Sequence, residues 1–190
     1  MRRQLVPALA VFLFFTALVG VVYPLAVTGV ARIAFPSKSQ GSLVREGGVV
    51  VGSRLLGQAF SGPRYFQPRP SAAGAGYDGA ASAASNLGPT NPVLLKSVRE
   101  RVASYRSFNG LAANAPVPVD AVTASGSGLD SEISPANARL QAPRVARARA
   151  LPLARVLALV RENTHGRSLG FLGEPGVNVL ELNLALDKVK

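Results

Sequence analysis

One long apolar stretch near the N-terminus constrains this chain more than any other feature. Residues Leu5–Ala31 include no charged side chain. As an α-helix the stretch would be about 40 Å long, whereas the hydrocarbon core of a bilayer is about 30 Å thick. A lone segment can cross a bilayer only as a helix, because a helix satisfies its own backbone N–H and C=O groups. The sequence therefore predicts a single transmembrane helix at about residues 5–31, within an N-terminal region that comprises residues 1–35.

A cleaved secretory signal is the alternative interpretation of this stretch. Arg2 and Arg3 are typical of the basic start of such a signal. However, the apolar part of a signal is only about 7–15 residues long, and no A-x-A cleavage site follows closely here. An uncleaved anchor is favoured. Within it, Gly20, Pro24 and Gly29 predict a kink or a close packing contact with another helix.

The charges that flank the span do not decide its orientation. Arg2 and Arg3 precede it, and Arg32, Lys38 and Arg45 follow it. The positive-inside rule needs an excess of cations on one side. Neither flank has a clear excess.

The remaining residues, 36–190, are enough for one domain with a hydrophobic core. The chain has a formal net charge of +11, but only 6% of its residues are aromatic and none is Trp. Single-stranded nucleic-acid binders stack bases on aromatic side chains, so no nucleic-acid partner is expected. The absence of cysteine excludes disulfides and thiolate chemistry, and a single His argues against a metal site.

Local patterns predict a mixture of helices and strands after the span. Asn91-Pro92 is a helix start and Asn109-Gly110 an end, and Ser134-Pro135 starts another helix that Pro143 should kink or divide. The other expected elements are a strand at 49–51, a flexible loop at 71–85 and a bulged terminal strand at 177–186. A helix is also expected at 152–163, with its inward face formed by Leu153, Val156, Leu157 and Val160. Because helices and strands do not alternate regularly, we predict an α+β fold.

A Gly/Ser-rich segment is the best candidate for an anion or nucleotide site. Thr123, Ser125, Gly126, Ser127 and Gly128 form a loop whose backbone N–H groups can converge on an anion, and Arg139 or Arg144 can add positive charge. Alternatively, Gly126 and Gly128 simply supply positive φ in a tight connection.

A serine hydrolase can also be assembled from this region of the chain. Ser125 or Ser127 would be the nucleophile, His165 the base, and Asp120 or Asp130 the orienting acid. Neither Ser125 nor Ser127 lies in a G-x-S-x-G motif, and His165 lies in a sequence typical of a helix end. The pattern gives this alternative little support.

Along nearly its whole length the chain resembles the C subunit of the Kdp potassium-transporting P-type ATPase. The shared motifs include Ser85–Pro89, Thr123–Asp130 with Ile133–Pro135, and Gly173–Pro175 with Val177–Leu184. The sequence departs from the family at Ser131-Glu132, where Pro-His is frequent, and at Gly176, where Arg is frequent. This chain has Glu132 where the family often has that His, so a role of the His is not carried over to it.

The resemblance implies a non-catalytic accessory subunit of a high-affinity potassium uptake pump in the bacterial inner membrane. Its partners would be a channel-like potassium-binding subunit, a P-type catalytic subunit and a very small single-span subunit, together with membrane lipid. K⁺ and ATP/Mg²⁺ would be handled by those subunits, with no cofactor in this chain.

The resemblance also implies a topology, with the N-terminus in the cytoplasm and the α+β domain on the outer side of the membrane. There the domain would cap or modulate the ion-selecting subunit. A nucleotide-binding modulator that uses residues 123–128 requires a cytoplasmic domain, so these two interpretations exclude each other.

Overall fold

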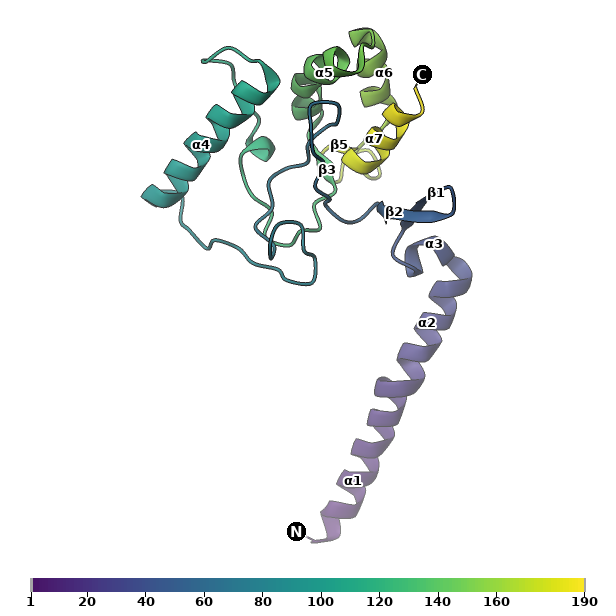
Figure 1. Ribbon diagram of the computed structural model, residues 1–190. Coiled ribbons are helices and arrows are strands. Elements are labelled where there is room, and N and C mark those ends of the chain that lie inside the picture. The colour runs from purple at the N-terminus through teal and green to yellow at the C-terminus, as the bar shows by residue number, and fades with distance from the viewer. Residues whose placement is uncertain (1, 190) are drawn as a thin grey trace. The chain divides into compact units, whose positions relative to one another are not determined.

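The structure, a computed structural model, describes residues 2–189 and divides into two compact units between Val51 and Gly52. The first unit holds the apolar stretch. It forms helix α1 (Arg2–Ala17), a π-helical turn η1 (Leu18–Val22) and helix α2 (Tyr23–Ala34) in one continuous rod (Figure 1). The predicted helix is confirmed and extends to Ala34. Its mean hydropathy reaches 2.6, and the apolar side chains of this stretch are exposed within the chain, so it is long and apolar enough to cross a membrane.

The π-helical turn accounts for the proline inside the span. Pro24 has no N–H, and in a regular α-helix its ring would crowd the carbonyl of Gly20 four residues earlier. Just before it, the N–H of Tyr23 bonds to the oxygen of Leu18, five residues back, so the helix is locally wider. Such turns are frequent at functional sites.

After the span, the first unit continues with α3 (Pro36–Ser39), β1 (Leu43–Glu46) and β2 (Val49–Ser53). Strands β1 and β2 form a two-stranded sheet joined by Gly47-Gly48, whose φ values are +57° and +84°. Two consecutive positive φ values suit a tight hairpin and favour glycine. The strand expected at 49–51 is confirmed within β2.

The second unit is a mixed α+β domain, as predicted. Its helices are α4 (Pro92–Asn109), the 3₁₀ turn η2 (Val119–Ala121), α5 (Pro135–Arg149), α6 (Leu153–Glu162) and α7 (Val179–Asp187). Its sheet is antiparallel, in the order β3 (Glu132–Ile133), β5 (Gly176–Asn178), β4 (Thr164–His165), with Ile133 and Thr164 both opposite Val177.

The core lies where α5, α6 and α7 meet this sheet. Its largest apolar side chains are 2% exposed or less: Phe66, Ile133, Val145, Val156, Val177, Leu182 and Leu186. The helix starts follow the predicted capping logic, since the side chain of Asn91 accepts from the N–H of Val93 and that of Ser134 from the N–H of Asn137. Helix α4 ends at Gly110 in the left-handed conformation.

Three expectations are wrong. Residues 179–187 form α7 and not a strand, because Asn178 caps a helix there and Val179, Leu182 and Leu186 share a helical face. Pro143 does not divide the helix, since α5 is one helix from Pro135 to Arg149, with the neighbouring Ala142, Arg144 and Val145 buried in the domain. In α6, Val156 and Val160 are buried as expected, but Leu153 is exposed, and Leu159 is buried as well.

The segment 71–85 has more structure than its composition suggests. The hydroxyl of Ser71 accepts from the N–H groups of Ala73 and Tyr77, and Ala73 is fully buried. The phenol of Tyr77 donates to the carbonyl of Arg69 at 3.0 Å, and burial raises its pKa. These contacts give the segment a defined path against the domain.

Candidate functional site

A row of buried polar side chains follows one face of α5. Asn137, Gln141 and Arg144 are spaced i, i+4 and i+7, which places them on one side of the helix. Gln141 Nε2 donates to Asn137 Oδ1 at 2.9 Å, and Arg144 Nη2 donates to Gln141 Oε1 at 2.9 Å. At the far end Asn137 Nδ2 donates to Asp120 Oδ2 at 2.9 Å. We call these four residues the polar row; its two amides are aligned between a cation and an anion.

The guanidinium of Arg144, at the cationic end of the row, donates its hydrogen bonds to neutral carbonyl and amide oxygens. Its Nη1 donates to the carbonyls of Pro63 and Tyr65, and its Nε donates to Asn109 Oδ1 at 2.9 Å. The guanidinium also lies 4.4 Å from the ring centre of Phe108. Burial lowers the pKa of Arg144 to about 10, and the nearby Tyr105 opposes this effect. Arg144 therefore ties three separate segments of the domain together.

Two side-chain amides form the backbone hydrogen bonds of the segment before Pro68, bonds that a neighbouring strand makes in a sheet. Asn183 Oδ1 accepts from the N–H of Phe66 at 2.9 Å, and its Nδ2 donates to the Phe66 carbonyl at 3.0 Å. Gln141 does the same for Gln67, at 2.7 Å and 3.0 Å. Buried backbone groups must be paired, and here the pairs come from helices α7 and α5.

Asp120, at the anionic end, fixes the start of α5 and indirectly the position of α4. It accepts from the N–H and the hydroxyl of Ser134 at 2.8 Å and 2.9 Å. The phenol of Tyr105, on α4, donates to Asn137 Oδ1 at 2.8 Å. Burial first, and then the charge of Asp120, raise the pKa of Tyr105, while Arg144 acts in the opposite direction.

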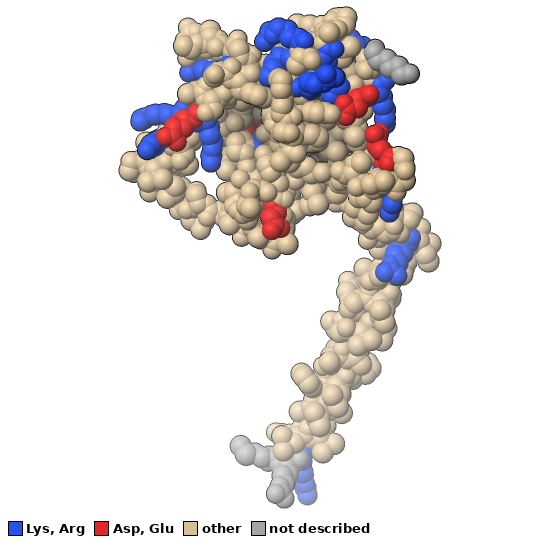
Figure 2. All heavy atoms as spheres, viewed as in Figure 1, with Lys and Arg blue, Asp and Glu red and all other residues tan. Residues whose placement is uncertain are grey.

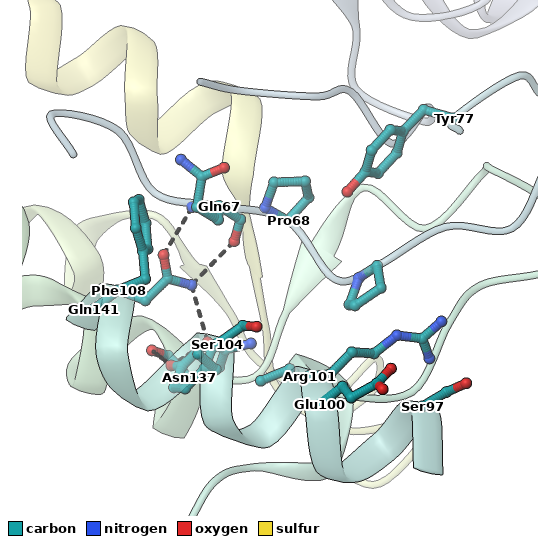
Figure 3. Close-up of a pocket in the computed structure, with 13 residues that line it drawn as sticks. Gln67, Pro68, Tyr77, Ser97, Glu100, Arg101, Ser104, Phe108, Asn137 and Gln141 are labelled. Carbon is teal, nitrogen blue, oxygen red and sulfur yellow. Dashed lines mark hydrogen bonds between the residues drawn. The ribbon is translucent and has the colours of Figure 1, made fainter. Parts of the chain in front are cut away.

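A cavity of about 640 Å³ lies between α4 and this polar row. Figure 3 shows Gln67, Asn137 and Gln141 joined by hydrogen bonds along it. Its other walls include Pro68, Pro70, Tyr77, Phe108, Arg101 and Ser104. Apolar walls with a few fixed polar groups are typical of a binding cavity, so this is the candidate site for a small molecule or a peptide segment.

The loop Thr123–Gly128 is paired with other segments of its own chain. The N–H of Ser125 donates to the carbonyl of Pro70 and the N–H of Gly128 to the hydroxyl of Ser125. The hydroxyls of Ser125 and Ser127 lie 3.4 Å apart, and the carbonyl of Gly126 accepts from the N–H of Ala83. Gly128 has φ of +71°, so one of the two glycines supplies positive φ.

The structure does not bring Arg144 to this loop, since its hydrogen bonds go to the polar row and to Pro63, Tyr65 and Asn109. Arg139 is exposed on α5. Figure 2 shows Lys and Arg side chains gathered on the surface in the region of α5. Two other cations lie beside the loop. Arg69 donates to the carbonyl and the hydroxyl of Thr123 at 3.3 Å and 3.2 Å, and Arg101 donates to the carbonyl of Val122 at 3.1 Å. Arg101 shares a small cavity of about 210 Å³ with Thr123, Ser125 and Gly126.

Within residues 2–189, the base and the acids of the hydrolase hypothesis have partners other than Ser125 and Ser127. Among the described residues, the ion partner of His165 is Glu181, 3.6 Å away, and Asp130 pairs with Arg69 at 2.9 Å. Asp120 belongs to the polar row. His165, Asp130 and Asp120 are therefore not arranged around a serine nucleophile.

In the span, Gly20 lies in the π-helical turn and Gly29 in α2, with Pro24 in the first turn of α2. A Cβ added at either glycine would meet nothing within 4 Å. Both positions are therefore open to a neighbouring helix.

Asn137, Gln141 and Asn183 were not among the predicted site residues. For Asn137 and Gln141 a signal was available in the sequence. Both lie on the face of α5 that carries apolar residues, which are buried: Ala138, Ala142 and Val145. A polar residue on a buried helix face needs a partner, which marks such residues for attention.

Comparison with known proteins gives matches over the whole chain. Residues 5–188 match the family described as KdpC: K⁺-transporting ATPase, c chain. The potassium-transporting ATPase KdpC subunit of Mycobacterium bovis (strain BCG / Pasteur 1173P2) is 58% identical over 189 residues, covering 100% of each chain. The subunit of the same name from Beijerinckia indica is 57% identical, covering 98% of this chain and 94% of that one. The one from Rhodospirillum rubrum is 56% identical, covering 99% and 97%.

Proposed function

The chain belongs to the KdpC family of potassium-transporting ATPase subunits, and from this premise we propose that it is a non-catalytic accessory subunit. In this proposal it stabilises an ATP-driven potassium uptake pump, and its domain caps or modulates the ion-selecting subunit and the use of ATP by the catalytic subunit. K⁺ and ATP/Mg²⁺ are bound by those partners.

The observation that carries this proposal is the fully exposed apolar helix Arg3–Ala34. Apolar surface of this extent requires cover by lipid or by other transmembrane helices. The family match covers this helix together with the domain, which supports a role in anchoring and assembly that involves the whole chain.

The proposed partners are the channel-like potassium-binding subunit, the P-type catalytic subunit and the very small single-span subunit. The proposed location is the bacterial inner membrane, with the N-terminus in the cytoplasm and the domain outside. Family resemblance supports this orientation.

A nucleotide-binding modulator is the second candidate, and one observation favours it. Arg101 lies beside the Gly/Ser-rich loop at a small cavity. Against it, the N–H groups of Ser125 and Gly128 already donate within the chain. This candidate also requires the domain to be cytoplasmic.

Assembly through the span is tested by Gly20→Leu and Gly29→Leu, each made in the complete pump. Because the chain itself has room for a side chain at both positions, lost co-purification of the other subunits would report a close helix contact. Ala10→Leu, at an exposed position of α1, is the matched control. We expect at least one glycine variant to reduce co-purification severalfold and the control to leave it unchanged. Unchanged assembly in both variants would contradict packing at these glycines.

A further inference from the structure

The last residues of the span and the segment that follows it expose apolar side chains next to basic ones. Ile33 and Phe35, at the end of α2, are exposed by 86% and 58%. In the hairpin, Leu43, Val49 and Val50 are also exposed, Val49 by 67%. We call residues 33–50 the collar. A two-stranded hairpin is marginally stable in water, and exposed valines do not improve this.

The basic side chains of the collar and of Arg32 just before it favour an anionic neighbour. Arg32, Lys38 and Arg45 stand against a single acid, Glu46. Arg45 is held over the hairpin turn, where its Nη1 donates to the carbonyl of Gly48 at 3.2 Å. Cations next to apolar side chains match the headgroup region of a bilayer, where phosphates lie above the acyl chains.

The backbone keeps the hairpin close to the end of the span, within the same compact unit. The N–H of Ser42 donates to the carbonyl of Ser37 at 2.9 Å, so the chain returns to α3 just before β1 begins. Ser37 is three residues beyond Ala34, a distance of at most about 10 Å. The helix Arg3–Ala34, at about 48 Å, also exceeds the hydrocarbon core. The hairpin therefore starts within reach of the headgroups.

We propose that the collar is an interfacial anchor that lies in the lipid headgroup region, with its apolar side chains at the acyl boundary and its cations on anionic headgroups. The long stems of Arg and Lys can lie along apolar groups while their charges reach the phosphates. This role goes beyond assembly of the pump, because it would hold the start of the domain at the membrane surface whichever subunit it contacts.

The test uses the absence of cysteine from the chain. A single cysteine in the full-length protein, Val50→Cys, is labelled with the polarity-sensitive dye NBD and reconstituted into vesicles of phosphatidylcholine, with or without phosphatidylglycerol. Lipids brominated on the acyl chains quench the dye at the acyl boundary. Ala113→Cys, exposed in the second unit, is the matched control.

We expect blue-shifted emission at position 50 and quenching by brominated lipid at least about twofold greater than at position 113. Phosphatidylglycerol should strengthen the quenching, and the added changes Lys38→Gln and Arg45→Gln should abolish that gain. Quenching at position 50 that is no greater than at position 113 would overturn the proposal. A blue shift of the dye at position 50 that appears only when the other pump subunits are present would also overturn it, because the collar would then bind a protein.

Discussion

Two segments of the domain lie outside its three-stranded sheet, and they are held in different ways. The segment Phe66-Gln67 is paired by the side chains of Asn183 and Gln141. The segment around Ser125 is paired by backbone groups, since its N–H donates to Pro70 and its carbonyl accepts from Ala72. The first arrangement depends on a few side chains, and one substitution can break it. The backbone pairing around Ser125 does not depend on side chains. A substitution should disrupt it only where the backbone has no room for an added Cβ.

The largest effect is expected at Arg144. Arg144→Met would leave the carbonyls of Pro63 and Tyr65, and the amide oxygens of Asn109 and Gln141, without this donor. A buried acceptor left without its donor costs about 1–3 kcal/mol, and because four acceptors share this donor we expect a total loss of about 3–5 kcal/mol. Thermal and denaturant unfolding of the full chain in detergent measures the loss. Arg139→Met, at an exposed position on the same helix, should change the free energy of unfolding by at most about 0.5 kcal/mol. Similar losses in both variants would refute the special role of the polar row.

A smaller effect is expected in the backbone-paired segment at Gly128. Its φ is +71°, and an added Cβ would lie 3.0 Å from the Cβ of Ala73. Gly128→Ala should therefore cost about 1–3 kcal/mol in the same unfolding measurement. Gly166→Ala is the control, because its added Cβ would meet nothing within 4 Å. A Gly128 variant as stable as this control would show that the segment tolerates a side chain.

The smallest effect is a pH dependence at Tyr105. Its pKa is raised in the folded chain, so above about pH 10 the unfolded chain loses this proton while the folded chain keeps it. Stability from this group is complete below about pH 10 and is lost as pH rises. The lowered pKa of Arg144 acts in the opposite direction, so the comparison is wild type against Tyr105→Phe. Between about pH 9 and pH 11, wild type should lose stability more steeply than the variant. Parallel curves would contradict the raised pKa.

Sequence patterns predicted those features of the fold that depend on residues close to one another in the sequence. The span, and the caps at Asn91 and Ser134, follow from a few consecutive side chains. The terminal helix was missed because its apolar residues fit both a strand and a helical face, and the cap at Asn178 decides for the helix.

The candidate site was less predictable because its contacts join distant residues. The Gly/Ser-rich loop was visible in the sequence, but its pairing with Pro70 and Ala83 was not. The bond between Phe66 and Asn183 joins positions 117 residues apart, and no local pattern indicates it. Arg144 was noticed as a charge, whereas its role follows from burial that only the fold reveals.

The central claim, an accessory subunit whose domain lies outside the membrane, is tested most directly by the side on which the domain is labelled. Ala75→Cys gives one exposed thiol in a chain that otherwise has none. Intact cells that carry the complete pump are treated with a membrane-impermeant maleimide, and this chain is then isolated to measure its labelling. Labelling in intact cells is the predicted result. Protection until the cells are broken open would contradict it, and the nucleotide-binding alternative at Arg101 and residues 123–128 would then be favoured.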